Sequence, residues 1–212
     1  MSLKNLAFIL LLFCFVVRAK KFTIILSPEG DSANPGRSLP DGFECGFTRQ
    51  YAELLKEALE QDETIRAIMS HEVGEQVSQY EKASFANRLE ADLYISINFY
   101  SSEKPSLSIY YYTSSLFEPP ADSSRLELFS TTKAYALCDK QTKKMAQYWQ
   151  LLNSYQAQLY INGPIPLPVK QLEGIAIPAF VLELGAQKIT DVYRYVQPVS
   201  EILKKNAHEQ KL

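Results

Sequence analysis

The sequence has 212 residues, of which 46% are hydrophobic and 22% are charged, and its formal net charge is −2. This makeup is typical of a soluble globular protein with one domain, or at most two small ones. The pI is near 5.8, and no basic run exceeds two or three residues. Composition and charge therefore argue against nucleic acid as a partner and against a polybasic membrane patch.

The first 19 residues predict a secretory signal peptide. Lys4 gives a positive start, residues 6–17 are an unbroken apolar run, and Ala19 occupies a position suited to cleavage. We expect secretion across the inner membrane to the periplasm or cell envelope, with no stable membrane span after cleavage. An uncleaved anchor and lipidation of Cys14 are alternatives, although the run is short for a bilayer and the residue before the cysteine is not small.

Two cysteines remain after the predicted cleavage, Cys45 and Cys138. They could form one disulfide in an oxidising compartment, or both could be small buried hydrophobic residues, and the sequence leaves the two interpretations open. Neither belongs to a close cysteine pair, which argues against a zinc site built from cysteines.

Strands and helices alternate along the first part of the mature chain. Residues 21–26 predict a strand, and a loop rich in glycine and proline follows as far as residue 42. Residues 44–61 predict an amphipathic helix, because apolar side chains recur at three- and four-residue spacing. A strand at 64–69 and a helix at 77–89 come next.

The central predicted strand is residues 93–97, which are rich in β-branched and aromatic side chains. We expect Asn98 to close this strand. Polar residues at the carboxyl ends of strands in open α/β sheets face the ligand crevice, although Asn98 could simply turn the chain. Residues 106–113 predict a further strand, whose three consecutive tyrosines could stack on sugar or peptide, or fill the core.

The second part of the chain continues the alternation. We expect a loop at 114–124 and a helix at 125–152, at least from residue 132 onward. A strand-like and irregular approach at 153–168, an apolar strand at 175–185 and a closing amphipathic helix at 191–206 follow. Strands that alternate with helices predict a single α/β domain, with a twisted, mostly parallel sheet and helices on both faces. This domain would span residues 20–206, followed by a polar tail at 207–212.

Four segments, taken in their order and spacing along the chain, indicate a family. They are KFTIILSPEGD, GFECGFTRQYAELLKEAL, KASFANRLEADLYISIN and IPAFVLELGAQ. Together they resemble the zinc-dependent N-acetylmuramoyl-L-alanine amidases that cleave peptidoglycan. The resemblance spans roughly residues 21–206, and SIYYY lies where the family has a glycine-led tyrosine strand. It implies the amidase fold, which is phosphorylase/hydrolase-like, and a role at the cell wall. Peptidoglycan or its fragments, or a cell-envelope protein, are then the expected partners.

That family cuts the amide between N-acetylmuramic acid and L-alanine. Zinc held by His, Glu and His polarises the carbonyl and lowers the pKa of a bound water, and a glutamate acts as general base and acid. By resemblance, Glu44 takes the position of the glutamate ligand and Glu183 that of the catalytic glutamate. Gly30 and Asn98 take the positions of the two histidine ligands, and Lys82 that of a family arginine.

The two changed positions weaken the expected zinc site. Glycine has no side-chain ligand, and an amide oxygen binds zinc much more poorly than an imidazole nitrogen. The two histidines of the sequence, His71 and His208, lie outside the ligand positions. We therefore expect no bound zinc. An oxygen-rich pocket for calcium or magnesium is a further hypothesis, and its candidate residues are Glu29, Asp31, Glu44, Asn98 and Glu183.

Simpler interpretations of these carboxylates stay open. Glu29 and Asp31 could be solvated turn residues, and Glu44 could be a first-turn carboxylate favoured by the helix dipole. Glu183 is harder to explain in this way, because a carboxylate near the end of an apolar strand needs a cleft or a partner.

The sequence thus predicts a secreted, amidase-like cell-wall protein that has lost catalysis and binds peptidoglycan or a partner. The alternative is an active amidase that hydrolyses the same amide with an altered metal site, or with Glu183 and no metal. A nucleophilic Cys45 is a third and weaker hypothesis, because no histidine is placed by the alignment to activate it.

Overall fold

The computed structural model describes residues 20–113, 131–151 and 159–210. The predicted signal peptide and the predicted loop at 114–124 lie outside these residues. The main sheet has six strands in the order β4-β1-β5-β8-β6-β7. Their bounds are β1 Phe22–Pro28, β4 Ile65–Met69, β5 Leu93–Ser101, β6 Ser106–Tyr112, β7 Tyr160–Leu167 and β8 Ala179–Ala186.

Most neighbouring strands of this sheet are parallel. β4, β1, β5 and β8 pair in parallel, β6 is antiparallel to β8, and β7 is parallel to β6. β1 and β5 are buried along almost their whole length. A strand with neighbours on both edges and cover on both faces needs apolar residues at nearly every position, as these sequences have.

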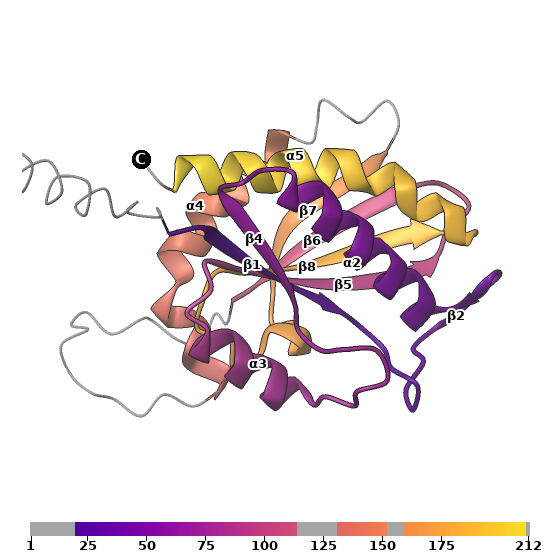
Figure 1. Cartoon of the computed structure of the whole chain (residues 1–212), viewed down its shortest axis with the longest axis horizontal. Helices are drawn as coiled ribbons and strands as arrows, with labels where there is room; N and C mark the ends of the chain where they lie inside the picture. The colour runs from indigo at the N-terminus through magenta and orange to yellow at the C-terminus, as the bar shows by residue number, and fades with distance from the viewer. Residues whose placement is uncertain (1–19, 114–130, 152–158, 211–212) are drawn as a thin grey trace, which may run out of the picture.

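Helices cover both faces of the sheet (Figure 1). α2 (Glu44–Glu60) and α5 (Tyr193–Glu209) pack against each other and, with α4 (Asp139–Trp149), enclose the larger apolar core. α3 (Gln79–Arg88) covers the opposite face over a smaller core. The predicted α/β domain with helices on both faces is confirmed.

α3 begins just after its capping residue, Ser78. The Ser78 side chain accepts a hydrogen bond from the Glu81 backbone N–H, and the Glu81 carboxylate accepts one from the Ser78 N–H. This reciprocal capping box satisfies donors that the first turn of a helix leaves unpaired. Ala83 and Ala86 then face the sheet, where small side chains let the helix approach closely.

The prediction that Asn98 closes its strand is wrong. β5 continues to Ser101, because its last residues pair in register with β8 as far as Ser101 and Ala186. Asn98 is therefore a residue within β5, and its register partner is Glu183.

The strand predicted at 175–185 begins later, at Ala179. The backbone just before it is bonded elsewhere, since the Ala176 N–H donates to Asn87 Oδ1 and the Asn87 side-chain amide donates to the Gly174 carbonyl. These hydrogen bonds attach the segment just before β8 to α3, whereas a strand residue would bond to a neighbouring strand.

The structure makes two further predictions more specific. A 3₁₀ helix at Thr131–Leu137 precedes α4, where a continuous helix was expected. The segment expected to be strand-like and irregular contains β7, an edge strand whose sequence YINGPIPL includes two prolines. An edge strand tolerates proline, because one side of it needs no ladder hydrogen bonds.

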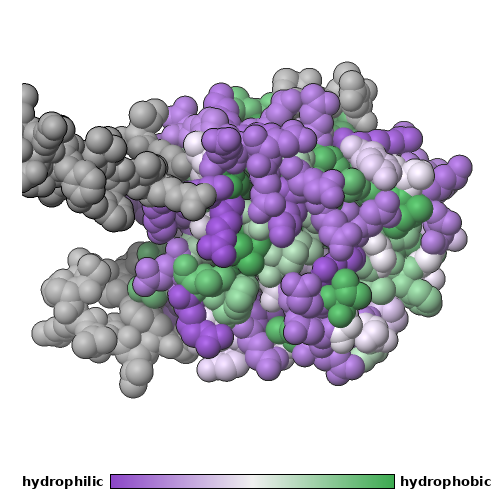
Figure 2. All heavy atoms as spheres, viewed as in Figure 1, coloured by the Kyte–Doolittle hydropathy of each residue, from purple (hydrophilic) through white to green (hydrophobic). Residues whose placement is uncertain are grey.

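The surface seen in Figure 2 is mostly polar, and its apolar residues lie in small groups between polar ones. In the three described segments of the chain, no helix is both long enough and apolar enough to cross a bilayer.

Candidate functional site

Three of the five residues singled out by resemblance lie together near the carboxyl end of the sheet. Asn98 and Glu183 are register partners on β5 and β8, so their side chains leave the sheet on the same face. Glu44, the first residue of α2, reaches across to β5, where its Oε1 accepts a hydrogen bond of 2.9 Å from the Phe99 N–H. This edge of a parallel sheet is where α/β proteins place ligands.

Arg37 lies between the two carboxylates, and the sequence did not single it out. Its Nη1 is 2.7 Å from Glu183 Oε1, and its Nε is 4.0 Å from Glu44 Oε2. The same Nη1 donates to the Phe99 carbonyl at 3.4 Å. One guanidinium thus joins the loop after β1 to β5, β8 and α2.

Glu183 is held from two sides. Its second oxygen, Oε2, accepts a hydrogen bond of 3.4 Å from the Tyr110 hydroxyl of β6. The Glu183 side chain is 25% exposed and that of Arg37 is 48% exposed. The carboxylate at the catalytic position is therefore reachable from solvent, but it is already ion-paired and hydrogen-bonded.

Glu44 is a structural acceptor as well as a first-turn carboxylate. The residue is only 5% exposed, and its two oxygens accept hydrogen bonds from the backbone N–H groups of Phe99 and Arg37. The Arg37 N–H can approach because Gly36 precedes it. Gly36 has φ +78°, and a Cβ there would lie 2.7 Å from Glu44 Oε2.

Gly30 has no room for a ligand side chain. Its φ is +87°, and a Cβ built on it would lie 2.9 Å from the Cβ of Cys45. A histidine at this position would need both a different backbone conformation and a shift of α2. The first histidine position of the family is therefore closed by geometry as well as by composition.

The residues present do not fit the zinc ion that the family implies. Two carboxylates and the buried amide of Asn98 are oxygen donors, whereas zinc sites favour imidazole and thiolate. A guanidinium beside both carboxylates adds a positive charge that repels a metal ion. Over residues 20–113, 131–151 and 159–210, no group of three or more His, Cys, Asp and Glu side chains is placed to hold a metal.

Glu29 is a partly buried ion-pair partner, which corrects its interpretation as a solvated turn residue. Its Oε2 is 2.9 Å from Lys82 Nζ, and its Oε1 accepts a hydrogen bond of 3.1 Å from Ser96. Lys82 itself is only 6% exposed. Both oxygens of Glu29 are thus engaged, and it offers no free carboxylate to the other two glutamates.

Asp31 is the turn residue that was expected. Its Oδ1 accepts hydrogen bonds from the backbone N–H groups of Asn34 and Ala33, at 2.7 and 2.8 Å. These bonds, that from Asn34 above all, lower the pKa of the Asp31 carboxyl. The five residues proposed for an oxygen-rich pocket therefore differ in their partners. Glu44 and Glu183 lie beside Arg37. Glu29 and Asn98 share Ser96, and Asp31 holds the turn.

A hollow of about 330 Å³ lies beside the candidate site. Cys45 and His71 both line it. His71 Nδ1 is hydrogen-bonded to the Ser70 hydroxyl at 2.8 Å. Partial burial, together with the charges of Lys82 and Arg49, lowers the pKa of His71.

The two cysteines are not bridged to each other. Cys45 and Cys138 are both free thiols, and burial raises the pKa of Cys138 to about 11. His208, the other histidine, is bonded to Asp62 at 2.7 Å through its Nε2.

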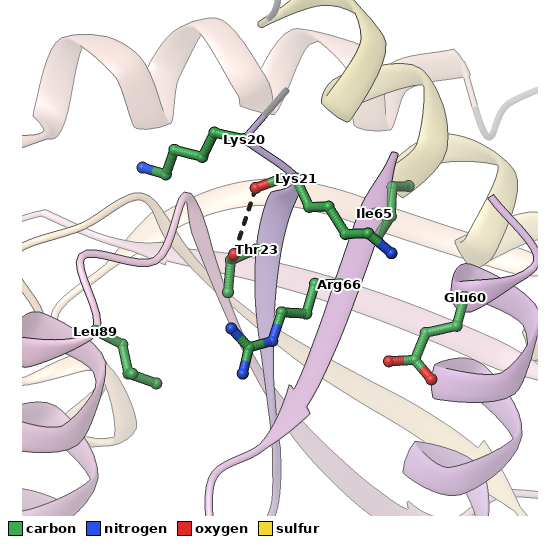
Figure 3. Close-up of a pocket in the computed structure, with 7 residues that line it drawn as sticks. All are labelled: Lys20, Lys21, Thr23, Glu60, Ile65, Arg66 and Leu89. Atoms are coloured by element: carbon green, nitrogen blue, oxygen red, sulfur yellow. Dashed lines mark hydrogen bonds between the residues drawn. The ribbon is translucent and has the colours of Figure 1, made fainter. Parts of the chain in front are cut away.

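A larger hollow, of about 770 Å³, lies at the opposite end of the sheet (Figure 3). It is lined by Lys20, Lys21, Thr23, Glu60, Ile65, Arg66 and Leu89. It adjoins the amino ends of β1 and β4, and parallel sheets bind ligands beyond the carboxyl ends. Size alone therefore does not make this hollow the candidate site.

Comparison with known proteins identifies the family of the chain. A model of the N-acetylmuramoyl-L-alanine amidase family matches residues 25–198. No curated protein sequence matches the chain.

Solved amidase structures share the fold. The amidase Ami1 of Mycobacterium abscessus has a TM-score of 0.59 at 15% identity, over 88% of this chain and 99% of its own. The catalytic domain of CwlV from Bacillus (Paenibacillus) polymyxa has a TM-score of 0.55 at 14% identity, over 86% and 96%. CwlD of Clostridioides difficile, solved in complex with the GerS lipoprotein, has a TM-score of 0.53 at 14% identity, over 88% and 98%.

The family model covers most of the chain, and the shared fold places Glu44, Asn98 and Glu183 together at the carboxyl edge of the sheet. The chain therefore belongs to the N-acetylmuramoyl-L-alanine amidase family.

Proposed function

We propose that this protein is a secreted member of the amidase family that binds peptidoglycan, or a partner protein in the cell envelope, without hydrolysing it. One observation carries the proposal: the Arg37 guanidinium is 2.7 Å from the carboxylate of Glu183, the position of the family's general base. The predicted signal peptide at residues 1–19 supports delivery to the cell envelope.

We expect no hydrolysis because of the residues at the family's metal-ligand and general-base positions. Zinc-assisted amide hydrolysis needs three strong ligands and an open position for water. This chain offers Gly30, which has no ligand, and Asn98, whose amide is a weak one. A general base must be free to meet the water that it deprotonates, and Glu183 is instead ion-paired with Arg37 and accepts a hydrogen bond from Tyr110.

The same edge of the sheet is suited to binding. Arg37 is about half exposed, and the adjoining hollow of about 330 Å³ lies next to the same loop. A guanidinium and a phenol can donate hydrogen bonds to the carbonyl and carboxylate groups of a peptide. The C. difficile relative solved with a lipoprotein supports a cell-envelope protein as the other class of partner.

The test compares hydrolysis and binding on one batch of purified protein. The chain from residue 20 onward is incubated with purified peptidoglycan, with and without added zinc, and soluble fragments and co-sedimented protein are both measured. We expect no release of fragments under either condition and clear co-sedimentation. Release that needs zinc and is lost in Glu183→Gln would show that the protein is an active amidase.

Two arginine variants show where the ligand binds. Arg37→Ala removes a donor at the candidate site, whereas Arg66→Ala removes an arginine from the hollow at the other end of the sheet. We expect Arg37→Ala to weaken co-sedimentation several-fold and Arg66→Ala to leave it unchanged. Equal binding by both variants would contradict a site at the carboxyl edge, and no binding by the wild type would leave the partner protein as the ligand.

A further inference from the structure

We propose that the guanidinium of Arg37 is the resident cation of this site and takes the electrostatic place of a metal ion. The inference rests on the proposed non-catalytic function and explains how the site keeps its shape without a metal. Its evidence is the charge balance around Glu44 and Glu183 and the way the loop holds Arg37.

The site contains two carboxylates and one cation in contact. The side chain of Glu44 is 7% exposed and that of Glu183 is 25% exposed, and Arg37 reaches both. Carboxylates that share a site with no cation repel each other, and burial adds a desolvation penalty to each charge. An arginine offsets both the repulsion and the desolvation penalty, because it stays protonated and presents several hydrogen-bond donors in a planar fork.

The loop backbone fixes Arg37 in this place. The Arg37 N–H donates to Glu44 Oε2 at 3.0 Å, and the Glu44 N–H donates to the Arg37 carbonyl at 2.9 Å. The next residue of α2, Cys45, donates its N–H to the Pro35 carbonyl at 3.0 Å. Gly36 allows this approach, since any Cβ there would meet the Glu44 carboxylate. These backbone hydrogen bonds fix the loop against the start of α2. They therefore also fix where the Arg37 side chain leaves the backbone.

A resident cation has a testable consequence. Once the guanidinium is removed, the two carboxylates and the Asn98 amide are left as oxygen donors with no positive charge among them. Such donors suit hard divalent cations, of which Mn²⁺ is one. The wild-type chain should therefore ignore Mn²⁺, and a chain without the Arg37 side chain should acquire a site for it.

The experiment is a Mn²⁺ titration followed by electron paramagnetic resonance, in which only free Mn²⁺ gives the sharp aqueous signal. The proteins are the mature wild type, Arg37→Ala, the double variant Arg37→Ala with Glu183→Ala, and Arg66→Ala as the matched control. We expect Arg37→Ala to bind one Mn²⁺ at least tenfold more tightly than the wild type. The double variant and Arg66→Ala should both return to the wild-type level.

Two results would overturn the proposal. One is a folded Arg37→Ala variant, checked by circular dichroism, that binds Mn²⁺ no better than the wild type. The other is a wild type that binds one Mn²⁺ per chain or loses thermal stability when a chelator is added. If Arg37→Ala does not fold, Arg37→Gln replaces it, because glutamine keeps the first part of the side chain and removes the charge, and the same outcomes apply.

The Mn²⁺ titration and the hydrolysis assay test different proposals, and either proposal can be overturned without the other. Hydrolysis of peptidoglycan by the wild type would end the proposed function, whereas the Mn²⁺ titration reports only on which cation the two glutamates hold. A wild type that cuts peptidoglycan while ignoring Mn²⁺ would leave Arg37 as the resident cation of an active enzyme.

Discussion

Two ion pairs lie near the carboxyl end of the same sheet. The distances between their charged groups are similar, but their burial differs. Lys82 and Glu29 are 2.9 Å apart, with side chains 7% and 20% exposed. Arg37 and Glu183 are 2.7 Å apart, with side chains 48% and 25% exposed. Since water screens an exposed pair and not a buried one, the same geometry has different consequences in the two places.

The buried pair joins elements, and the half-open pair lies where a ligand can reach. Lys82 brings α3 against the end of β1, and Ser96 of β5 completes the hydrogen bonds of Glu29. Arg37 also joins elements, but its side chain is 48% exposed to solvent. We therefore expect the first pair to govern stability and the second to govern binding.

The largest effect on stability is expected from Lys82→Ala. The substitution leaves the Glu29 carboxylate largely buried without its cation, which should lower the free energy of unfolding by about 2–4 kcal/mol. Urea denaturation followed by circular dichroism measures it. Combining Lys82→Ala with Glu29→Gln should recover part of the loss, because the stranded charge is then absent. A loss below that of Arg37→Ala would contradict the assignment of roles to the two pairs.

The sequence predicts most of the fold because the fold depends on local patterns. The apolar strands β1 and β5 and the amphipathic α2 have the periodicity that burial requires. β7 was predicted only as part of a strand-like and irregular approach, since glycine and two prolines normally indicate a loop, and its position at the edge of the sheet makes them acceptable. Edge position is a property of the whole sheet and cannot be read from eight residues.

The candidate site was also predicted only in part. The resemblance named Glu44, Asn98 and Glu183, and the structure brings them together. Arg37 was missed because it is a single arginine in a loop rich in glycine and proline, and its partners come from distant strands. The one available signal was Gly36 immediately before it, since a glycine at that point indicates a close approach of the backbone.

A smaller effect on stability is expected from Arg37→Ala. Its ion pair is half exposed, and the Arg37 N–H still donates to Glu44 after the side chain is removed. The free energy of unfolding should therefore fall by about 1 kcal/mol, between the values of surface and buried pairs. The same urea titration at low and high salt should show a loss that shrinks with salt for Arg37→Ala and stays nearly constant for Lys82→Ala. Equal salt dependence of the two variants would contradict the difference in burial.

The smallest effect is a pH dependence that His71 adds next to the buried pair. Partial burial, Lys82 and Arg49 lower the pKa of His71, while Glu29 and Glu75 oppose this. The folded protein therefore binds fewer protons than the unfolded chain once the pH falls below about 6.5, the ordinary histidine value. Stability contributed by neutral His71 is present above that pH and is lost as the pH falls toward the lowered pKa. His71→Asn should shrink the drop in urea midpoint between pH 7.5 and pH 5, and an unchanged drop would show that His71 does not titrate in this way.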